Sequence, residues 1–481
     1  MSVDPTAWYC ALNAVDEMVD REGRGRPGRA RVLERFTNLG DQIFDLQVAS
    51  EAAIKAKGIT FTLSSSEGNV DRAWPFDVLP RVIPADEWRR VTEGLNQRLS
   101  ALNHLIADLY ADRKVIADKI VPEELFATSV NLRPECNGVQ PPGGLWAHIC
   151  GTDLVRDDSG EFLVLEDNLR VPSGVSYMLE NRQISKQVLA DAFEDLTILP
   201  VDIYTERLAE LLGSLSPRPG RKPVIALLTP GPYNSAYYEH VMLAMRMGAL
   251  LVEGSDLVVE DGVVNALTVR GPVRVDVIYR RVDDLFLDPT VFNPDSVLGV
   301  PGLMGAWAAG KVAIANAPGA GVADDKVVYS YVPDLIRYYL DEEAILPNVE
   351  TWRCGDPASL SHVLANLDKM VVKPANESGG AGIVIGSRAT RAELDKVADV
   401  IKADPRNWIG QPVLQLSTAP TICDGVVAPR HVDLRPFVLA GERPYVTSGG
   451  LTRVAMNEGS LVVNSSQGGG SKDTWVVEET S

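Results

Sequence analysis

The residues best suited to chemistry lie in two strand-like runs joined by a turn, GTDLVRDDSGEFLVLEDN, at residues 151–168. If the Ser-Gly pair at the turn forms a two-residue loop, counting outward sets Asp153 directly opposite Glu166. Asn168 follows two residues later, so strand alternation puts it on the same face. A four-residue loop would keep this shared face, whereas a three-residue loop would break it.

Two carboxylates and an amide oxygen on one face repel each other unless a cation or a proton lies between them. Hard oxygen ligands, few in number and with room left for phosphate, suit Mg²⁺ far better than zinc. The pattern therefore predicts a magnesium site at Asp153, Glu166 and Asn168. The alternative is a solvated hairpin end, with a shared proton or a water between the acids. Asp167 points to the other face and is expected to be structural.

A second motif, MVVKPANESGGAGIVIG at residues 370–386, predicts a strand, a glycine-rich turn and a second strand. Backbone N–H groups of such a turn can wrap polyphosphate, and Lys373 at the strand end adds a positive charge. The GxxxxGK[ST] order is absent and no helix follows the glycines directly, which excludes a Walker A loop and a dinucleotide fingerprint. A plain hairpin turn remains the alternative.

Composition limits the partners of this 481-residue chain. A formal charge of −19 disfavours binding to a phosphate backbone, so we expect no nucleic-acid partner. No run approaches the roughly 20 apolar residues of a membrane span, and the N-terminus lacks the basic-then-apolar pattern of a signal peptide. We therefore expect a cytoplasmic protein without a membrane partner. Five scattered cysteines, never in CxxC spacing, argue against a disulfide framework or a thiolate zinc site.

The rest of the chain must supply the elements that hold these motifs. The stretch DEWRRVTEGLNQRLSALNHLIADLYADRKVI carries apolar residues at three-and-four spacing and predicts a helix. Between 223 and 283, strand and helix patterns alternate, which predicts an α/β unit with a mostly parallel sheet. We expect a mostly helical N-terminal region, a hairpin part of the core, the α/β unit, a lid with the glycine loop, and a C-terminal part of the core. Their expected bounds are 1–125, 126–200, 201–320, 321–420 and 421–481.

Taken together, these motifs resemble the ATP-grasp ligases, specifically the circularly permuted branch that includes glutathionylspermidine synthetase-like proteins. In that family an acid, about a dozen residues and then Glu-x-Asn at a strand end bind two magnesium ions, which matches the 151–168 hairpin. Two family lysines that hold the nucleotide look like Lys326, in GVADDKVVYSYV, and Lys373. Ordinary members carry the lysines and the glycine loop before the metal acids. Here the order is reversed, as in the permuted branch.

The resemblance implies an α/β (α+β) fold of the circularly permuted ATP-grasp type, with a pre-ATP-grasp α/β unit, and ATP and Mg²⁺ as cofactors. The adenine hinge resembles IGQPVLQL, although the family usually has an acidic residue where this chain has glutamine. The implied nucleotide-binding residues are Lys326, Lys373, Glu377, Ser378, Gly379, Gly380, Gly382, Gln411 and Val413.

The implied activity joins a carboxylate to an amine, after phosphoryl transfer from ATP has turned the carboxylate into an acyl phosphate. An enzyme helps such a transfer mainly by position and positive charge. Arginine suits the substrate carboxylate and the oxyanion, because its planar fork bonds them at two points. The candidate catalytic residues are Arg170, Arg280, Arg435 and Arg453, with Arg170 and Arg435 placed first. Each of them could instead be a salt-bridge partner on the surface.

Two other functions stay open at this point: a nucleotide-binding scaffold or regulatory protein without turnover, and a phosphotransferase on the same fold. Retention of three metal ligands and both lysines favours catalysis. The partners are then ATP and an acid and an amine, small molecules or peptides, whose identity the sequence does not specify. The tail NSSQGGGSKDTW is expected to lie near substrate or phosphate, with a frayed terminus as the alternative.

Overall fold

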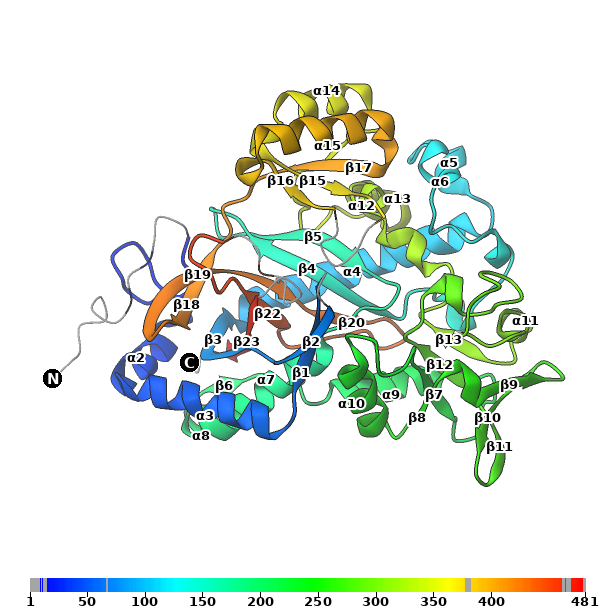
Figure 1. Cartoon of the computed structure of the whole chain (residues 1–481), viewed down its shortest axis with the longest axis horizontal. Coiled ribbons are helices and arrows are strands. Elements are labelled where there is room, and N and C mark those ends of the chain that lie inside the picture. The colour runs from blue at the N-terminus through cyan, green and yellow to red at the C-terminus, as the bar shows by residue number, and fades with distance from the viewer. Residues whose placement is uncertain are drawn as a thin grey trace.

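The computed structural model describes residues 9, 11, 15–65, 68–376, 382–460, 463 and 469–478. Its centre is a mixed, largely antiparallel sheet built from three separate parts of the chain (Figure 1). Across the sheet the order is β21 (Tyr445–Val446), β20 (Phe437–Leu439), β4 (Ile149–Arg156), β19 (Val426–Arg435), β22 (Leu451–Val454), β23 (Gly470–Glu478) and β3 (Phe76–Pro84). Three further strands pair with this row: β5 (Phe162–Asn168) with β4, β18 (Thr418–Cys423) with β19, and β6 (Thr197–Ile198) with β23.

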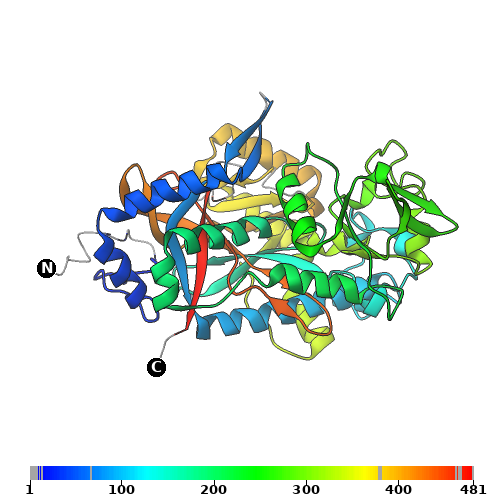
Figure 2. The same ribbon diagram turned by 90° about the horizontal axis from the view of Figure 1, so that it is seen from below.

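Strands from opposite ends of the chain, β3 and β23, lie side by side in this sheet and run parallel (Figure 2). Their side chains alternate between two cores, as the two-residue period of a strand requires. Val476 packs in the cluster that contains the apolar face of α4 (Ala85–Leu109). Its neighbours Trp475 and Val477 pack in a different cluster. The beginning of the chain is therefore part of the same folded unit as its end.

The helical pattern at the start of the chain is confirmed by α4, whose buried residues Trp88, Val91, Leu95, Leu99 and Leu102 follow one another at three-and-four spacing. Strands β1 and β2 interrupt the predicted N-terminal helical region, and β3 enters the central sheet. The other elements of the first 150 residues are α2 (Ala30–Leu39), α3 (Gln42–Ala56), β1 (Thr60–Ser65), β2 (Gly68–Ala73), α5 (Lys114–Ala117), α6 (Glu124–Ala127), η1 (Pro134–Cys136) and η2 (Pro142–Gly144).

The predicted α/β unit is confirmed by a second sheet with the parallel order β13-β12-β7-β8. Its elements are α9 (Tyr204–Ser214), β7 (Ile225–Leu228), α10 (Tyr237–Met247), β8 (Leu250–Val252), β12 (Val277–Arg280), α11 (Leu303–Ala308) and β13 (Ala313–Ala315). A small antiparallel sheet extends from it, formed by β9 (Leu257–Glu260), β10 (Val263–Thr268) and β11 (Gly271–Arg274), with η3 (Gly254–Asp256) and η4 (Asp284–Phe286) nearby in the chain. Helices α7 (Val175–Val188) and α8 (Ala190–Asp195) connect the hairpin to this unit.

A separate small layer, here called the lid, stands above β5 in Figure 1. It contains a sheet in the order β14-β17-β15-β16 and a core of its own that includes Val363, Val372 and Ile401. The lid consists of β14 (Trp352–Arg353), α14 (Pro357–Ala365), η6 (Leu367–Lys369), β15 (Met370–Pro374), β16 (Val384–Ile385), η7 (Gly386–Arg388), α15 (Arg391–Ala403), η8 (Pro405–Asn407) and β17 (Trp408–Pro412). It follows η5 (Ala320–Asp324), α12 (Lys326–Tyr329) and α13 (Val332–Leu340) in the chain.

Two short segments join the lid to the core: the first lid linker, residues 341–351, and the second lid linker, residues 413–417. Val349 of the first and Leu416 of the second pack together with Val155 of β4, and Leu163 and Leu165 of β5 pack against them. The lid is thus anchored on the same hairpin that carries the candidate metal ligands. No helix in the described part of the chain has the length and apolar character needed to cross a membrane.

Candidate active site

The pairing of β4 with β5 places Asp153 directly opposite Glu166, as predicted, and Gly151 opposite Asn168. Neither the two-residue turn nor the four-residue loop considered for this hairpin is present, because Arg156 pairs with Phe162 and five residues connect the strands. A loop with an odd number of residues would by itself shift the register by one residue and place Asp153 opposite Leu165 instead of Glu166. A β-bulge between Asp153 and Leu154 restores it, because Leu165 is the extra residue on β5.

Asp153 is buried and held by two arginines from neighbouring strands. Arg435 of β19 donates from Nε to Oδ1 at 2.5 Å and from Nη2 to Oδ2 at 2.7 Å, and Arg453 of β22 donates from Nη2 to Oδ2 at 2.8 Å. Burial works to raise the pKa of Asp153, but the two guanidinium groups outweigh it and hold the pKa below its ordinary value. Asp153 is therefore a stable anion that orients both arginines.

Asp433 completes this charge network and was not among the predicted site residues. It accepts Nε of Arg453 at 2.9 Å and, in a second bond at 2.5 Å, Nη2. Burial raises the pKa of Asp433, against the effect of Arg453. The sequence did contain a signal for it, because HVDLRPF sets Asp433 two residues before Arg435, on the same face of one strand.

One lysine lies within ion-pair distance of the other carboxylate, and a second lies near enough for the charge of that carboxylate to affect its pKa. Nζ of Lys326, at the start of α12, lies 3.6 Å from Oε2 of Glu166. Lys373 of β15 is buried, and burial lowers its pKa to about 8, partly offset by the charges of Glu166 and Asp153. The structure therefore brings together groups that the sequence separates widely: two acids from the hairpin, one lysine from the core and one from the lid.

Asp153, Glu166 and Asn168 form the candidate site for a divalent cation. The side-chain nitrogen of Asn168 donates to the Gly151 carbonyl at 3.1 Å, which leaves its oxygen as the atom able to bind a cation. Glu166 is partly exposed and shares that face. Asp153 accepts three N–H bonds from its arginines, whereas an ionised carboxylate can accept about four. The donor set is hard and oxygen-rich, so it fits Mg²⁺. Among the described residues no group of three or more His, Cys, Asp or Glu side chains forms a metal cluster.

Arg170 lies just beyond the hairpin and is committed to two acids. Its Nε donates to Asp324 at 2.7 Å and its Nη1 to Asp283 at 2.9 Å. Burial works to lower the pKa of Arg170, but these acids outweigh it and raise the pKa. The stem of its side chain crosses Gly321, where an added Cβ would lie 2.3 Å from Cδ of Arg170. Arg170 thus ties the end of β5 to the α/β unit.

The loop after Arg170 is fixed by a buried pair from the α/β unit. Glu239 accepts the backbone N–H groups of Gly174 and Ser176 at 2.8 and 3.1 Å. Arg281 donates to Glu239 at 3.0 Å and to the carbonyl of Pro172 at 2.6 Å. The same loop approaches the site, since Nη1 of Arg435 lies 3.4 Å from the carbonyl of Ser173.

The structure does not bring Arg280 to this cluster. Arg280 is fully buried at the end of β12 and pairs with Asp284 at 2.7 Å. Its other donors bond the carbonyls of Asn316 and Val282 at 2.7 and 2.9 Å. Its guanidinium is therefore used inside the α/β unit.

Part of the predicted nucleotide site lies in the lid. Glu377, Ser378, Gly379 and Gly380 fall outside the described residues, while Gly382 has a φ of +70° that favours glycine. The flanking strands β15 and β16 pair as predicted, with Val372 opposite Val384.

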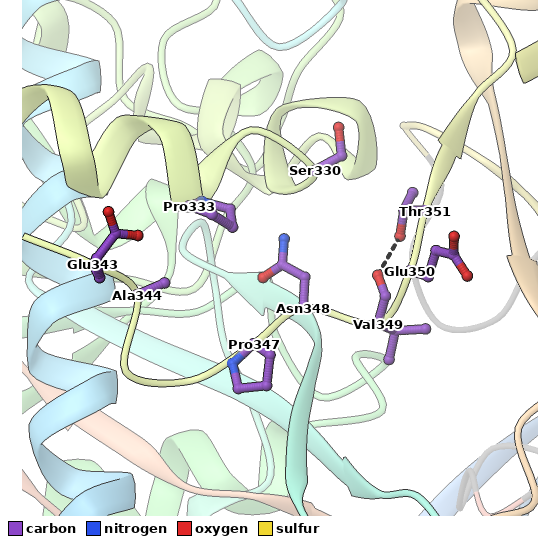
Figure 3. Close-up of a pocket in the computed structure, with 9 residues that line it drawn as sticks. All are labelled: Ser330, Pro333, Glu343, Ala344, Pro347, Asn348, Val349, Glu350 and Thr351. Carbon is purple, nitrogen blue, oxygen red and sulfur yellow. Dashed lines mark hydrogen bonds between the residues drawn. The ribbon is translucent and has the colours of Figure 1, made fainter. Parts of the chain in front are cut away.

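The predicted adenine hinge lies at the base of the lid. Nε2 of Gln411 donates to Oγ1 of Thr351 in the first lid linker at 3.0 Å. The N–H of Val413 donates to the Lys369 carbonyl at 3.1 Å. Beside this hinge is a pocket of about 350 Å³, bordered by the first lid linker and by Ser330 and Pro333 (Figure 3).

The expected ligand role of the tail is not supported at Lys472. This lysine is fully buried in β23, where its Nζ donates to Asp77 at 2.6 Å and to the carbonyls of Pro420 and Leu79 at 2.8 and 3.1 Å. All three ammonium hydrogens are thus used inside the core. The tail residues 464–468 lie outside the described residues.

A family model described as circularly permuted ATP-grasp type 2 matches residues 80–455. The chain belongs to this family. The match contains the hairpin, both lysines, the lid and the two arginines that hold Asp153, in the permuted order that the sequence predicts. At the level of its family, the chain is therefore an ATP-grasp ligase.

Relatives cover nearly the whole chain. An uncharacterised protein of Synechocystis sp. is 49% identical over 479 residues, 99% of this chain and 98% of that protein. An uncharacterised protein of Mycobacterium tuberculosis is 47% identical over 96% of this chain and 84% of its own length. A Frankia alni protein named "Putative glutamate--cysteine ligase 2-3" is 45% identical over 96% of this chain, which corresponds to 53% of that longer protein.

A solved structure shares the fold. The apo form of a glutathione synthetase-like effector from Globodera pallida superposes with a TM-score of 0.58 and 11% identity, over 91% of this chain and 98% of that one. At this identity the likeness shows the fold alone, a mixed α/β arrangement of the ATP-grasp type.

Proposed function

We propose that this ligase uses ATP and Mg²⁺ to convert a carboxylate into an acyl phosphate, which an amine then attacks. The observation that supports this most directly is the 3.6 Å distance between Nζ of Lys326 and Oε2 of Glu166, with the buried Lys373 near enough for the charge of Glu166 to raise its pKa. Acids that can hold a cation and lysines that can hold phosphate then lie within reach of one polyphosphate. Phosphoryl transfer depends mainly on such positioning and charge.

Glu166 and Asn168 supply oxygen ligands in this proposal, with one free acceptor position on Asp153 as the third. Mg²⁺ bound there would neutralise charge on the phosphates during transfer. Lys326 and Lys373 hold the phosphates, and the glycine loop, including Gly382, covers them and excludes water. Exclusion of water protects an acyl phosphate from hydrolysis.

The nucleotide base is assigned to the hinge. Because Nε2 of Gln411 is already bonded to Thr351, its carboxamide oxygen is the atom that can accept from an adenine amino group. The N–H of Val413 is also used, which leaves its carbonyl as a second acceptor.

Two arginines are assigned to the acid substrate. Arg435 and Arg453 are both held by Asp153 beside the cation ligands, and each can also bond a carboxylate or an oxyanion. Arg170, committed to Asp283 and Asp324, is assigned a positioning role in the floor of the site. Arg280 has no place in this proposal, because its donors are used elsewhere.

Amino acids and short peptides are the first substrates to test. The Frankia names point to amino-acid ligation, but this chain matches only about half of those proteins, and the named activity is not assigned to the matching half. The assay therefore screens the acid and the amine together.

The protein should be incubated with ATP, Mg²⁺ and pools of amino acids, polyamines and small peptides, with ADP, AMP and phosphate measured. We expect ADP together with a new amide. Formation of AMP would contradict an acyl phosphate intermediate. ADP without an amide would indicate a phosphotransferase, and binding of ATP without turnover in every pool would indicate a scaffold.

Glu166→Gln tests the site itself. We expect it to abolish Mg²⁺-dependent turnover without unfolding the protein, because the amide keeps the shape and loses the charge. Glu161→Gln is a matched control, since Glu161 lies exposed at the turn of the same hairpin, 3.7 Å from Arg90. Normal turnover by Glu166→Gln would remove the hairpin from the proposal.

A further inference from the structure

The face of β5 opposite Glu166 and Asn168 carries a buried ion pair. Asp167 lies between those two residues in sequence and bonds Arg98 of α4, with Nη2 to Oδ2 at 2.6 Å and Nε to Oδ1 at 3.4 Å. Both side chains are 1% exposed. Thr152, the residue before Asp153, donates its hydroxyl to the same carboxylate at 3.0 Å. Arg98 therefore bonds to the strand segment that carries the candidate cation ligands.

The same guanidinium also holds the first lid linker. Nη1 of Arg98 donates to the side-chain oxygen of Asn348 at 2.7 Å. Asn348 in turn donates to the carbonyl of Tyr329 at 2.9 Å. Tyr329 ends α12, the helix that begins with Lys326, and its hydroxyl donates to the carbonyl of Val164 in β5. Arg98 thus connects the strand that carries the candidate cation ligands with the first lid linker and, through Asn348, with the helix that begins at Lys326.

Backbone bonds support the linker on the same side. The N–H of Val164 donates to the carbonyl of Pro347, and the N–H of Val349 donates to the carbonyl of Val164, both at 2.9 Å. On another side the linker borders the pocket of about 350 Å³, where Asn348 and Val349 are among the lining residues (Figure 3). The linker is therefore not packed on all sides, and its bonds to β5 and Arg98 hold its position.

We propose that Arg98 is a positioning residue that couples the lid to the cation strand, so that nucleotide and Mg²⁺ bind cooperatively. The inference rests on the proposed function, since it requires that nucleotide phosphates contact lid and hairpin together. Its physical basis is the planar fork of arginine, which donates to Asp167 and Asn348 in fixed directions at once. A lysine ammonium can keep the ion pair with Asp167 without that fixed two-way geometry.

The test measures binding of the β,γ-imido analogue of ATP by calorimetry, with and without Mg²⁺, to the full chain and its variants. We expect Mg²⁺ to strengthen binding to the unchanged protein, and Arg98→Met to reduce that strengthening by about tenfold. Arg98→Lys should recover much of the thermal stability lost in Arg98→Met but not the coupling. A purely structural role predicts that stability and coupling recover together.

Arg182→Met is the matched control. Arg182 of α7 forms an equally buried pair with Asp473 of β23, at 2.8 Å and with side chains 1% and 2% exposed. It should lose stability and keep the Mg²⁺ effect. If Arg98→Met does not fold, Asn348→Ala tests the bond between Arg98 and the first lid linker alone, because it leaves the buried Arg98–Asp167 pair in place.

The outcomes separate the two proposals. If the unchanged protein does not bind the nucleotide analogue, the proposed function fails. If it binds with a clear Mg²⁺ effect that neither Arg98→Met nor Asn348→Ala reduces, the coupling role is wrong and the proposed function stands. Loss of the effect in Arg182→Met as well would also overturn the coupling role, since it would trace the effect to stability.

Discussion

Asp153 and Arg435 form a two-point ion pair across neighbouring strands, with N–O distances of 2.5 and 2.7 Å. The pair follows from the register, because Leu434 lies directly opposite Leu154 and the next residues of the antiparallel strands then face each other. Oδ2 of Asp153 also receives Arg453. The carboxylate and the arginines therefore fix one another before any ligand arrives.

Arg435→Lys tests this two-point geometry. Lysine keeps the charge but cannot donate to both oxygens of Asp153 in fixed directions, so we expect turnover to fall about 100-fold. ADP release under saturating ATP measures it. Arg443→Lys, at an exposed position in the following loop, is the control. Turnover at the unchanged rate in Arg435→Lys would assign Arg435 a purely structural role.

Lys373 should make nucleotide binding sensitive to pH. Burial lowers its pKa to about 8, so the ammonium is charged below pH 8 and loses its proton above it. Because phosphate binds the charged form, we expect affinity for Mg²⁺-nucleotide to fall above pH 8 by up to about tenfold per pH unit. Lys373→Arg should remove this fall, since guanidinium stays charged. The same fall in Lys373→Arg would assign it to another group.

Gly321→Ala should disturb the floor of the site. An added Cβ would lie 2.3 Å from Cδ of Arg170, whose guanidinium is held at its far end by two acids and cannot move freely. We expect a loss of about 1–3 kcal/mol in stability together with lower turnover. Gly305→Ala is the control, because nothing lies within 4 Å of its added Cβ and alanine favours helix. Unchanged stability and turnover in Gly321→Ala would contradict the close fit.

His148 should contribute to unfolding in acid. It is fully buried, its ring nitrogens have no hydrogen-bond partner among the described residues, and burial lowers its pKa to about 4. The unfolded chain then binds a proton between about pH 6.5 and 4 that the folded chain does not, so stability is lost as the pH falls through this range.

That loss is about 3 kcal/mol for the single residue. His148→Leu should flatten the corresponding slope in urea unfolding, whereas His104→Leu, at an exposed position on α4, should not. A slope that is the same in His148→Leu and the unchanged protein would show that other groups cause the acid sensitivity.

The candidate site was predictable where it depends on local strand geometry. Alternation placed Glu166 and Asn168 on one face and Asp167 on the other, and the register confirms the pair with Asp153. Counting outward from a two-residue turn gave the correct pair although the real loop is longer, because a bulge at Leu165 compensates for the added residues. Leu165 packs against the cluster that contains both lid linkers, a contact that no local pattern shows.

By itself, the sequence determined the motifs, their permuted order, the long helix α4 and the parallel α/β unit, because each depends on residue type and spacing within a short stretch. Only the tertiary structure decided which charges meet. Arg435 joins Asp153, Arg280 is used inside the α/β unit, and Lys472 is buried with Asp77. The physical reason is that an ion pair needs two groups within about 4 Å, and for segments hundreds of residues apart that distance is set by sheet order and register.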